Sequence, residues 1–294
     1  ALPISRLPRN DWSWAGDLLL DPSIDATGLA TFAKEVARTG RPLIWLDAVP
    51  FEADRWRRFA TAAVDAGLSV NTRESFRVGR IEIDRDWSAY ERSWTKNHRR
   101  HMRRVERNAE SIGGATLVVH RSINPGQVEP LVRRGFEIEM SGWKGRAGSS
   151  ALSSPAVFEL YVEQARLIAA IGQLQITFLV LGDRPIAFEY GWNAKGVYHS
   201  FKVGYDESFA RLSPGQLLRL QLLRQFFADP AQRAVDFVGP LTDATAKWST
   251  SAYPVGRLLL SGSRLGRLFI RAYRLRRRQS HAVVHNSERT TPGG

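Results

Sequence analysis

Three short apolar segments follow one another closely in the second half of the chain, and they constrain its fold more than any other feature. They are Leu174–Leu181, Pro185–Trp192 and Val197–Val203, separated only by residues 182–184 and by a turn at residues 193–196. Connections this short join antiparallel strands but cannot hold the crossover that parallel neighbours need. The pattern therefore predicts a meander of three antiparallel strands within an α+β fold.

An amphipathic helix is predicted directly after this meander. It starts with Ser213, Pro214, Gly215, Gln216 and Leu217, in which serine is a good N-cap and proline suits the first helical position. The free N–H groups of Gly215, Gln216 and Leu217 are expected to point out of the helix start, where the helix dipole favours an anion. Because Ser-Pro-Gly also begins ordinary helices, phosphate binding and simple capping both remain open.

The rest of the chain alternates predicted helices and strands. Its most distinctive element is one long helix over residues 86–111, ended by Gly113-Gly114. The other helices are predicted near residues 29–38, 53–65, 125–139, 156–171, 213–227 and from 264 onward, and the other strands near residues 42–49, 68–71, 77–83, 115–120, 234–238 and 257–260.

Composition excludes several classes of protein. The 294 residues include 43% hydrophobic residues, enough for a large core, and no cysteine, which excludes disulfides, thiolate metal sites and a cysteine nucleophile. No apolar run approaches the roughly 20 residues of a membrane span, and the N-terminus lacks a basic segment followed by an apolar one. These features predict a cytoplasmic protein without a transmembrane segment.

The formal net charge of +13 resides in two segments, because residues 92–107 carry +6 and residues 264–289 carry +7. Within the first segment, Arg99, Arg103 and Arg107 lie at helical spacing on one stripe. This stripe is either a solvated helix face or a contact to tRNA, anionic lipid or an acidic polysaccharide precursor. The basic C-terminal helix also has an apolar face, which fits packing on the sheet or lying on an anionic membrane surface.

One segment carries a family resemblance. Residues 139–151, which read EMSGWKGRAGSSA, resemble the E-x-x-G-W-K-G-x-x-G-(ST)-A run of the CelD/BcsL-like branch of the GNAT acyltransferases. Residues 202–206, the Ser213-Pro214-Gly215 junction and Lys247-Trp248 fit the same resemblance, which covers roughly residues 85–250. The chain is also similar to the Fem-type aminoacyl transferases, which fuse two GNAT-like lobes.

The resemblance implies a GNAT fold of two fused lobes. A degenerate N-terminal lobe that includes the long basic helix is expected over residues 1–113, and a complete acyltransferase lobe over residues 114–280. Residues 281–294 are expected to form a disordered tail.

The resemblance also implies the chemistry, in which an amine attacks a thioester with the help of a base and a charge that stabilises the oxyanion, without a metal. Acyl-CoA, with acetyl-CoA as the simplest case, is the implied co-substrate. Its pyrophosphate is expected at Arg211, Ser213, Pro214, Gly215, Gln216 and Leu217. Pro214 leaves this loop one N–H donor short of the usual GNAT loop. Lys247 resembles the lysine of the Fem-like Y-K-x-x-(FW) motif, with Ala246 in place of the aromatic residue, and is expected to stabilise charge.

Two carboxylates are candidates for the base. Period-two alternation places Glu189 with Ala187 and Gly191 on a small-residue face that is suited to lining a cleft. Glu139 ends a predicted helix and needs burial to raise its pKa. An ordinary exposed carboxylate remains the alternative for both.

Five residues are candidates for substrate contacts: Trp143, Lys144, Lys202, Tyr205 and Trp248. Trp143-Lys144 pairs an indole with a flexible cation, which suits a planar or anionic ligand, and the alternative is a tryptophan that anchors a loop. Strict alternation places His199 and Lys202 on opposite faces of their strand.

Three functions follow from these features. The leading hypothesis is an acyl-CoA-dependent acyltransferase acting on an amine or hydroxyl of a small metabolite or a cell-surface glycan precursor, as in polysaccharide biosynthesis, in the cytoplasm or peripherally at the inner membrane surface. The second is an aminoacyl-tRNA-dependent, Fem-like transferase. The third is a non-catalytic GNAT-like scaffold at the membrane surface.

Overall fold

The computed structural model describes residues 4–6, 18, 20, 21, 23–142 and 150–273. The expectations for Trp143, Lys144 and residues 281–294 lie outside the described residues. The chain forms two compact units. Unit 1 combines residues 1–77 with residues 253–294, and unit 2 is the continuous segment 78–252. The proposed pair of ancestral lobes, which divides the chain after residue 113, stays a prediction.

The sheet of unit 2 contains the meander. β5 (Leu174–Leu181), β6 (Arg184–Ala194) and β7 (Val197–Tyr205) pair antiparallel in sequence order, which confirms the prediction. β4 (Thr116–His120) pairs antiparallel with β5. β8 (Ala234–Pro240) pairs parallel with β7 on the other side.

β3 (Ser69–Glu82) contributes its last residues to this sheet and pairs antiparallel with β8. The sequence pattern predicted two separate strands, near residues 68–71 and 77–83, where the structure has this one long strand. The polar residues between the two apolar ends continue the strand although residues 72–75 are all exposed, because backbone hydrogen bonds to β9 hold an extended strand without burial of its side chains.

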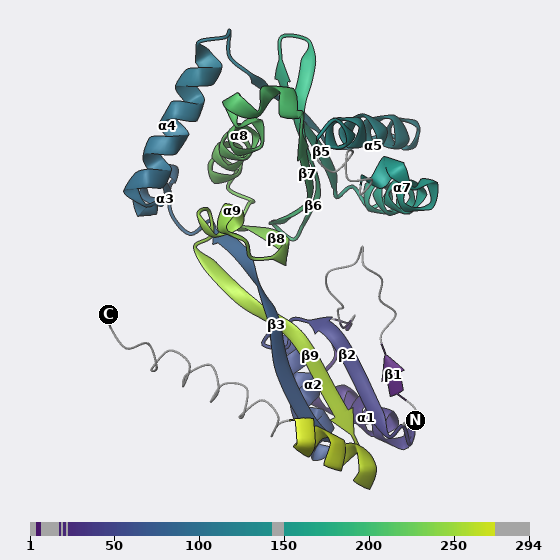
Figure 1. The fold of residues 1–294 in the computed structure, drawn as a ribbon. Helices are drawn as coiled ribbons and strands as arrows, with labels where there is room; N and C mark the ends of the chain where they lie inside the picture. The colour runs from purple at the N-terminus through teal and green to yellow at the C-terminus, as the bar shows by residue number, and fades with distance from the viewer. Residues whose placement is uncertain (1–3, 7–17, 19, 22, 143–149, 274–294) are drawn as a thin grey trace, which may run out of the picture. The chain divides into compact units, whose positions relative to one another are not determined.

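Helices cover both faces of the unit 2 sheet (Figure 1). α5 (Pro125–Met140) and α7 (Pro155–Ala170) pack on one face, where Phe136 and Phe188 of β6 have ring centroids 5.8 Å apart. α8 (Pro214–Ala228) packs on the other face, in one apolar cluster with Ala187. Neighbouring residues of β6 thus serve opposite layers, as the period of two requires.

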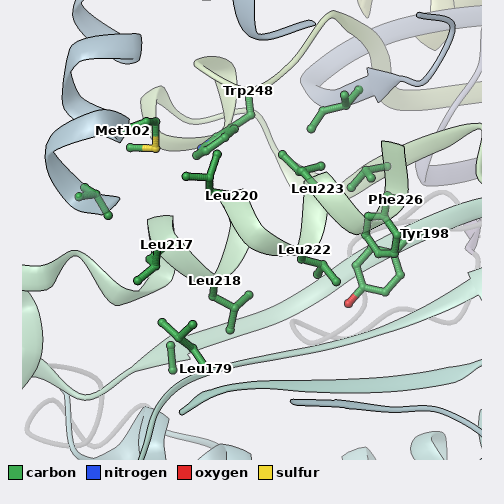
Figure 2. Packing of buried hydrophobic residues seen from close by; sticks show 14 of the residues in the cluster. Met102, Leu179, Tyr198, Leu217, Leu218, Leu220, Leu222, Leu223, Phe226 and Trp248 are labelled. Atoms are coloured by element: carbon green, nitrogen blue, oxygen red, sulfur yellow. The ribbon is translucent and has the colours of Figure 1, made fainter. Parts of the chain in front are cut away.

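α8 is buried on two sides, in contrast to the amphipathic helix expected. Leu218 and Leu222 face the sheet at Leu179 and Tyr198, whereas Leu220 faces a second layer (Figure 2). That layer includes Trp248 and Met102 of α4 (Lys96–Glu110). A helix that is apolar nearly all round needs cover on both sides, and α4 supplies the second one.

The long helix expected over residues 86–111 is two helices. α3 (Trp87–Ser93) ends where Trp94 becomes extended, with ψ at 153°. Thr95 then caps α4, because its side chain accepts the backbone N–H of His98 at 3.2 Å. The continuous helical spacing of apolar residues on both sides of the break conceals it in the sequence.

The sheet of unit 1 has the strand order β1–β2–β9–β3. β1 (Ile4–Arg6) pairs parallel with β2 (Leu43–Val49), and β9 (Ser251–Ser261) pairs antiparallel with β2. β9 is longer than the strand expected near residues 257–260.

Helices also cover both faces of this sheet. α1 (Ala26–Arg38) and α2 (Asp54–Asp65) bury their apolar sides with Leu258 and Leu260 of β9. Residues 264–273 are helical and pack on the opposite face, where Ile270 joins Leu43 and Leu259.

Candidate functional site

In unit 2, the neighbouring strands β7 and β8 are paired over only part of their length and then diverge. β7 and β8 pair at Val197 with Ala234, Tyr198 with Val235 and His199 with Asp236. Beyond this point, residues 200–205 of β7 and 237–240 of β8 have no registered partner in each other, and α8 begins shortly after the end of β7 (Figure 1). Strand edges without a partner strand present backbone N–H and C=O groups that an extended ligand can pair with.

A residue with a strained backbone, Val238, lies where β8 diverges from β7. Val238 has φ at +58°, a conformation that is costly for a β-branched residue. Its N–H donates to Asp236 Oδ1 at 2.8 Å. Val238 lies two residues beyond Asp236, the last residue of β8 that pairs with β7, and strained residues of this kind cluster at functional sites.

A buried ion pair occupies the α8 side of this divergence. Arg219 of α8 has Nη2 3.7 Å from Glu189 Oε2 and 3.4 Å from Ser200 Oγ. Its guanidinium also lies over the ring of Phe237, 4.7 Å from the centroid. Ser200 and Phe237 directly follow the last paired residues of the two strands, so Arg219 bridges them where they separate.

Glu189 is only 1% exposed, and its small-residue face is covered by α8 instead of lining an open cleft as predicted. Among the described residues, Glu189 Oε2 and the hydroxyl of Tyr198 are buried without a hydrogen-bond partner. Burial raises the pKa of Tyr198, and the nearby charge of Glu189 raises it further. Buried polar atoms that lack partners are unusual in native proteins, and two of those found among the described residues belong to this cluster.

Sequence reasoning missed Arg219. Within an amphipathic helix, an arginine between leucines is expected to face solvent, whereas Arg219 faces the sheet, where it contacts Ser200 and Phe237. A signal was available in residues 217–226, where six apolar residues are distributed around the helix instead of along one face.

A row of four side chains crosses the opposite face. Arg80 pairs with Asp236, Asp236 with His199, and His199 with Trp192 on four successive strands. Directly opposite residues of neighbouring strands point to the same face. The His199 and Trp192 rings stack with centroids 5.1 Å apart. Burial lowers the pKa of His199, against the opposing effect of Asp236.

A β-bulge corrects the expectation for Lys202. Tyr190 pairs with Lys202 but Gly191 pairs with Ser200, so β7 has one extra residue here. Lys202 and His199 therefore lie on the same face, the one covered by α5 and α7. The Lys202 ammonium lies 5.0 Å from the centroid of the Tyr161 ring.

Glu139 is on this side as well. It is 5% exposed at the end of α5, and its Cβ would lie 3.1 Å from a Cβ built on Gly204 of β7. The structure thus separates the two candidate bases. Glu139 lies on the α5 face with Lys202, and Glu189 lies on the α8 face with Arg219.

The start of α8 differs from the predicted phosphate loop. Ser213 is left-handed, with φ at +50°, and its side chain makes no capping bond. Its carbonyl instead accepts the N–H groups of Gln216 at 2.9 Å and Leu217 at 3.1 Å. The expectation of three free donors is therefore wrong, and only Gly215 retains an N–H without an acceptor in the described part of the chain. A carbonyl at the N-cap accepts the first backbone bonds of an ordinary helix, so these two N–H groups are satisfied within α8 itself.

Two further residues flank this helix start. Arg211 is exposed one turn earlier, and Tyr205 is 38% exposed. A Cβ on Gly215 would lie 3.7 Å from the Tyr205 ring. Asp206 holds the intervening turn through Ser208 and Arg184. Burial acts to raise the pKa of Asp206, but these bonds outweigh it and lower the pKa.

Lys247 and Trp248 are adjacent in sequence but differ in their exposure to solvent. Lys247 is exposed at the end of α9 (Asp243–Ala246), whereas Trp248 is fully buried and its Nε1 donates to Gln216 at 3.1 Å. Trp248 is therefore part of the core between α4 and α8. The charge of Lys247 lies near His98 and contributes, after burial, to a lowered pKa of that histidine.

A cavity of about 550 Å³ lies between α5 and α7, and none of the candidate site residues is among those that line it. Within the described ranges, no group of three or more histidine or acidic residues is arranged to hold a metal ion. No helix among the same residues is long and apolar enough to cross a membrane.

The order of meander, helix and parallel strand, with strands that diverge beside the helix start, defines an α+β fold of the GNAT type. The chain belongs to the acetyltransferase (GNAT) domain family, whose model matches residues 96–247, about half of the chain. No curated protein sequence matches it significantly.

Solved structures share this fold at low sequence identity. A conserved protein of unknown function from Bacteroides thetaiotaomicron has a TM-score of 0.54 at 10% identity, covering 80% of this chain and 75% of that one. The C-terminal domain of a putative lysylphosphatidylglycerol synthetase from Agrobacterium fabrum has a TM-score of 0.53 at 13% identity, covering 86% and 78%. FemX has a TM-score of 0.53 at 11% identity, covering 83% and 77%. At these identities the likeness concerns the fold alone.

Proposed function

We propose that the protein is an acyltransferase that moves an acyl group from acyl-CoA to an amine or hydroxyl of a small metabolite or a cell-surface glycan precursor, as a CelD/BcsL-like enzyme. The observation that carries this proposal is the divergence of β7 and β8 next to the start of α8, in a chain of the GNAT family. An extended carrier laid along the free edge of β7 brings its acyl end to the point where the strands separate.

The residues divide into three roles in this proposal. Gly215 N–H, the positive end of α8 and Arg211 bind the carrier phosphates, with Tyr205 beside them. The acyl group lies at the strand divergence near Ser200. Glu139 or Glu189 accepts the proton of the acceptor, Lys202 contacts the acceptor, and Lys247 stabilises negative charge.

Thermal unfolding with and without acetyl-CoA tests the carrier. A ligand that binds the native state at 100 times its Kd adds about 2.7 kcal/mol to the free energy of unfolding, so millimolar acetyl-CoA is expected to raise the Tm by several degrees. An unchanged Tm at millimolar acetyl-CoA would contradict the proposal.

A second candidate is an aminoacyl-tRNA-dependent transferase, as in the Fem-type enzymes that the sequence resembles. The outer face of α4 favours it. Arg100, Arg103, Arg104 and Arg107 are exposed, and none pairs with a carboxylate in the described part of the chain. Arg99, which was expected in this stripe, instead caps α3 by donating to the carbonyl of Arg92 at 2.6 Å.

Binding to bulk tRNA at several salt concentrations separates the two candidates. Each phosphate neutralised by an arginine contributes roughly 0.7 to 0.9 to the slope of log K against log salt. The double variant Arg103→Glu, Arg107→Glu is therefore expected to weaken binding and flatten the slope, and Arg57→Glu serves as a control on an exposed helix in unit 1. Protein that binds no tRNA at low salt would exclude this candidate.

We also propose a peripheral location at an anionic membrane surface, whether the protein acts as an enzyme or as a scaffold. The helix at residues 264–273 supports it, because Leu265 and Leu268 are 65% and 62% exposed and lie between the exposed Arg264 and Arg271. Apolar side chains flanked by arginines match the pattern of interfacial helices.

A further inference from the structure

We propose that Arg219 is a catalytic residue of the acyl transfer, whose guanidinium binds the carbonyl oxygen of the acyl group, and that Glu189 is its positioning residue. The inference rests on the proposed acyltransferase function. It concerns the α8 side of the site, whereas the proposed acceptor contact, Lys202, lies on the opposite face.

Arg219 lies at the point where the two strands separate. It contacts Ser200 of β7 and Phe237 of β8, the first residues beyond the last registered pair of the two strands. It lies five residues beyond Pro214, about 7.5 Å along the helix axis from the start of α8. The same helix therefore carries the proposed phosphate contacts at its start and Arg219 further along, beside Ser200, where the acyl group is proposed to lie.

Most of the hydrogen-bond donors of Arg219 have no acceptor among the described residues. A guanidinium has five N–H donors, and Arg219 makes one hydrogen bond within the described residues, the long one to Ser200 at 3.4 Å. The distance of 3.7 Å to Glu189 is an ion pair without a hydrogen bond, and it leaves Glu189 Oε2 buried and unpartnered. A purely structural buried pair is expected to have short, bidentate geometry, because only that geometry offsets the desolvation of both charges.

The two charged side chains differ in burial. The Arg219 side chain is 12% exposed, whereas that of Glu189 is 2% exposed. The arginine side chain thus keeps some contact with solvent, while the carboxylate is almost fully enclosed. A charge in such a partly dry environment interacts with a developing oxyanion more strongly than it would in water.

The step assigned to Arg219 is the formation of the tetrahedral intermediate. The nitrogen of the acceptor attacks the thioester carbonyl carbon, a C–N bond forms, and the carbonyl π electrons move to the oxygen that Arg219 binds. The C–S bond then breaks as these electrons return, the thiolate leaves with the bonding pair, and the amine proton passes to a carboxylate. With Glu189 engaged by Arg219, that carboxylate is Glu139 on the opposite face.

A double-variant comparison tests the assignment, using the full chain and the probes acetyl-CoA and CoA. Arg219→Met leaves Glu189 as a buried unpaired charge and is expected to lower the Tm, and Arg219→Met with Glu189→Gln is expected to recover most of it. The affinities for acetyl-CoA and for CoA, measured by calorimetry, then report whether Arg219 contacts the acyl group. The wild type is expected to prefer acetyl-CoA over CoA, and the double variant to lose about tenfold of that preference.

Arg224→Met is the matched control, because Arg224 lies on the same helix and pairs with Glu106 at 2.5 Å. It is expected to leave the preference unchanged. Arg219→Lys keeps the charge without the planar fork, so it is expected to fold and to lose part of the preference even if the double variant does not fold.

The outcomes distinguish the two proposals. If the wild type binds both ligands equally, or if the Arg219 variants fold and keep the wild-type preference, the role of Arg219 is overturned while acyl-CoA binding stands. If the wild type binds neither ligand, the proposed carrier fails and the inference fails with it.

Discussion

Gly191 shows how little space is left at the level of single residues beside the candidate site. A Cβ at this position would lie 2.3 Å from the carbonyl oxygen of His199 and 2.7 Å from the hydroxyl of Tyr198. The first contact is with the backbone of β7, which cannot move without disturbing the bulge. A glycine is therefore required here for close approach, although its own backbone is extended.

Gly191→Ala is expected to lower the free energy of unfolding by about 2 kcal/mol or more, because the added methyl group overpacks a rigid neighbour. Urea denaturation measures the change. Gly215→Ala is the matched control, since its Cβ would meet only Tyr205 at 3.7 Å. It is expected to change stability by less than about 1 kcal/mol. Equal losses in the two variants would contradict this explanation.

His98 is a buried histidine in an aromatic surrounding. Its ring centroid lies 4.6 Å from that of Trp248 and 4.7 Å from that of Trp94, and its Nε2 has no hydrogen-bond partner among the described residues. Burial lowers the pKa of His98 to about 4, and the charges of His101 and Lys247 act in the same direction. The folded state thus favours the neutral imidazole.

The pKa of His98 determines a pH dependence of stability. His98 binds a proton near pH 6.5 in the unfolded chain but only near pH 4 in the folded chain. The contribution of neutral His98 to the free energy of unfolding is therefore fully present above pH 6.5 and is lost as the pH is lowered. From pH 7 to pH 5 the expected loss is roughly 2 kcal/mol. Urea denaturation at pH 7 and at pH 5 measures this loss. In the His98→Phe variant, the decrease in the free energy of unfolding between the two pH values should be smaller by the contribution of His98. An identical loss in the variant would show that other groups cause it.

Single residues were also where prediction from sequence was least complete. The type and spacing of Glu189 drew attention to it, but its partner Arg219 is distant in sequence and looks like an ordinary surface arginine. Ser213 has the identity of an N-cap, yet its left-handed backbone prevents side-chain capping. The face of Lys202 depends on one extra residue in β7, which no alternation pattern records.

The helix at residues 264–273 illustrates how one element can have two apolar sides. Ile270 packs on the sheet of unit 1, and Leu265 and Leu268 point to solvent between arginines. The alternatives of packing and membrane contact, which the sequence left open, are therefore compatible, because different residues of the same helix serve each one.

The exposed side of this helix predicts selective binding to anionic vesicles. The full chain is expected to sediment with phosphatidylglycerol vesicles and not with phosphatidylcholine vesicles, and Leu265→Glu with Leu268→Glu should reduce binding at least about tenfold. Leu167→Glu is the control, since Leu167 is an equally exposed leucine, at 70%, on a different helix, α7. Wild-type protein that fails to sediment with either vesicle would refute the proposal.

Prediction of elements succeeded where local patterns determine them. The meander is fixed by short connections and alternation, and the sequence placed its three strands correctly. The break between α3 and α4 escaped because Thr95 and Arg99 satisfy the helix ends within a continuous apolar spacing. The burial of α8 on its second side, by α4, was not predicted, because it depends on that break and on long-range packing.

At the scale of the whole molecule, the fold class could be predicted because the order of elements is specific to it. The division into units could not, because it depends on which distant strands pair. β9 lies between β2 and β3 in the sheet of unit 1, although it follows β3 by a long stretch of chain. No local sequence pattern near residue 251 indicates that β9 lies between β2 and β3.

The interrupted path of unit 1 has a consequence for synthesis on the ribosome. All of unit 2 lies between the two segments of unit 1, and β9, which separates β2 from β3, is translated after every other described strand. We expect nascent chains that end at residue 252 to contain a protease-resistant segment from unit 2, while residues 1–77 remain cleavable. Resistance of residues 1–77 should appear only once residues 253–273 have emerged, so the order of translation makes the N-terminal segment the last to fold.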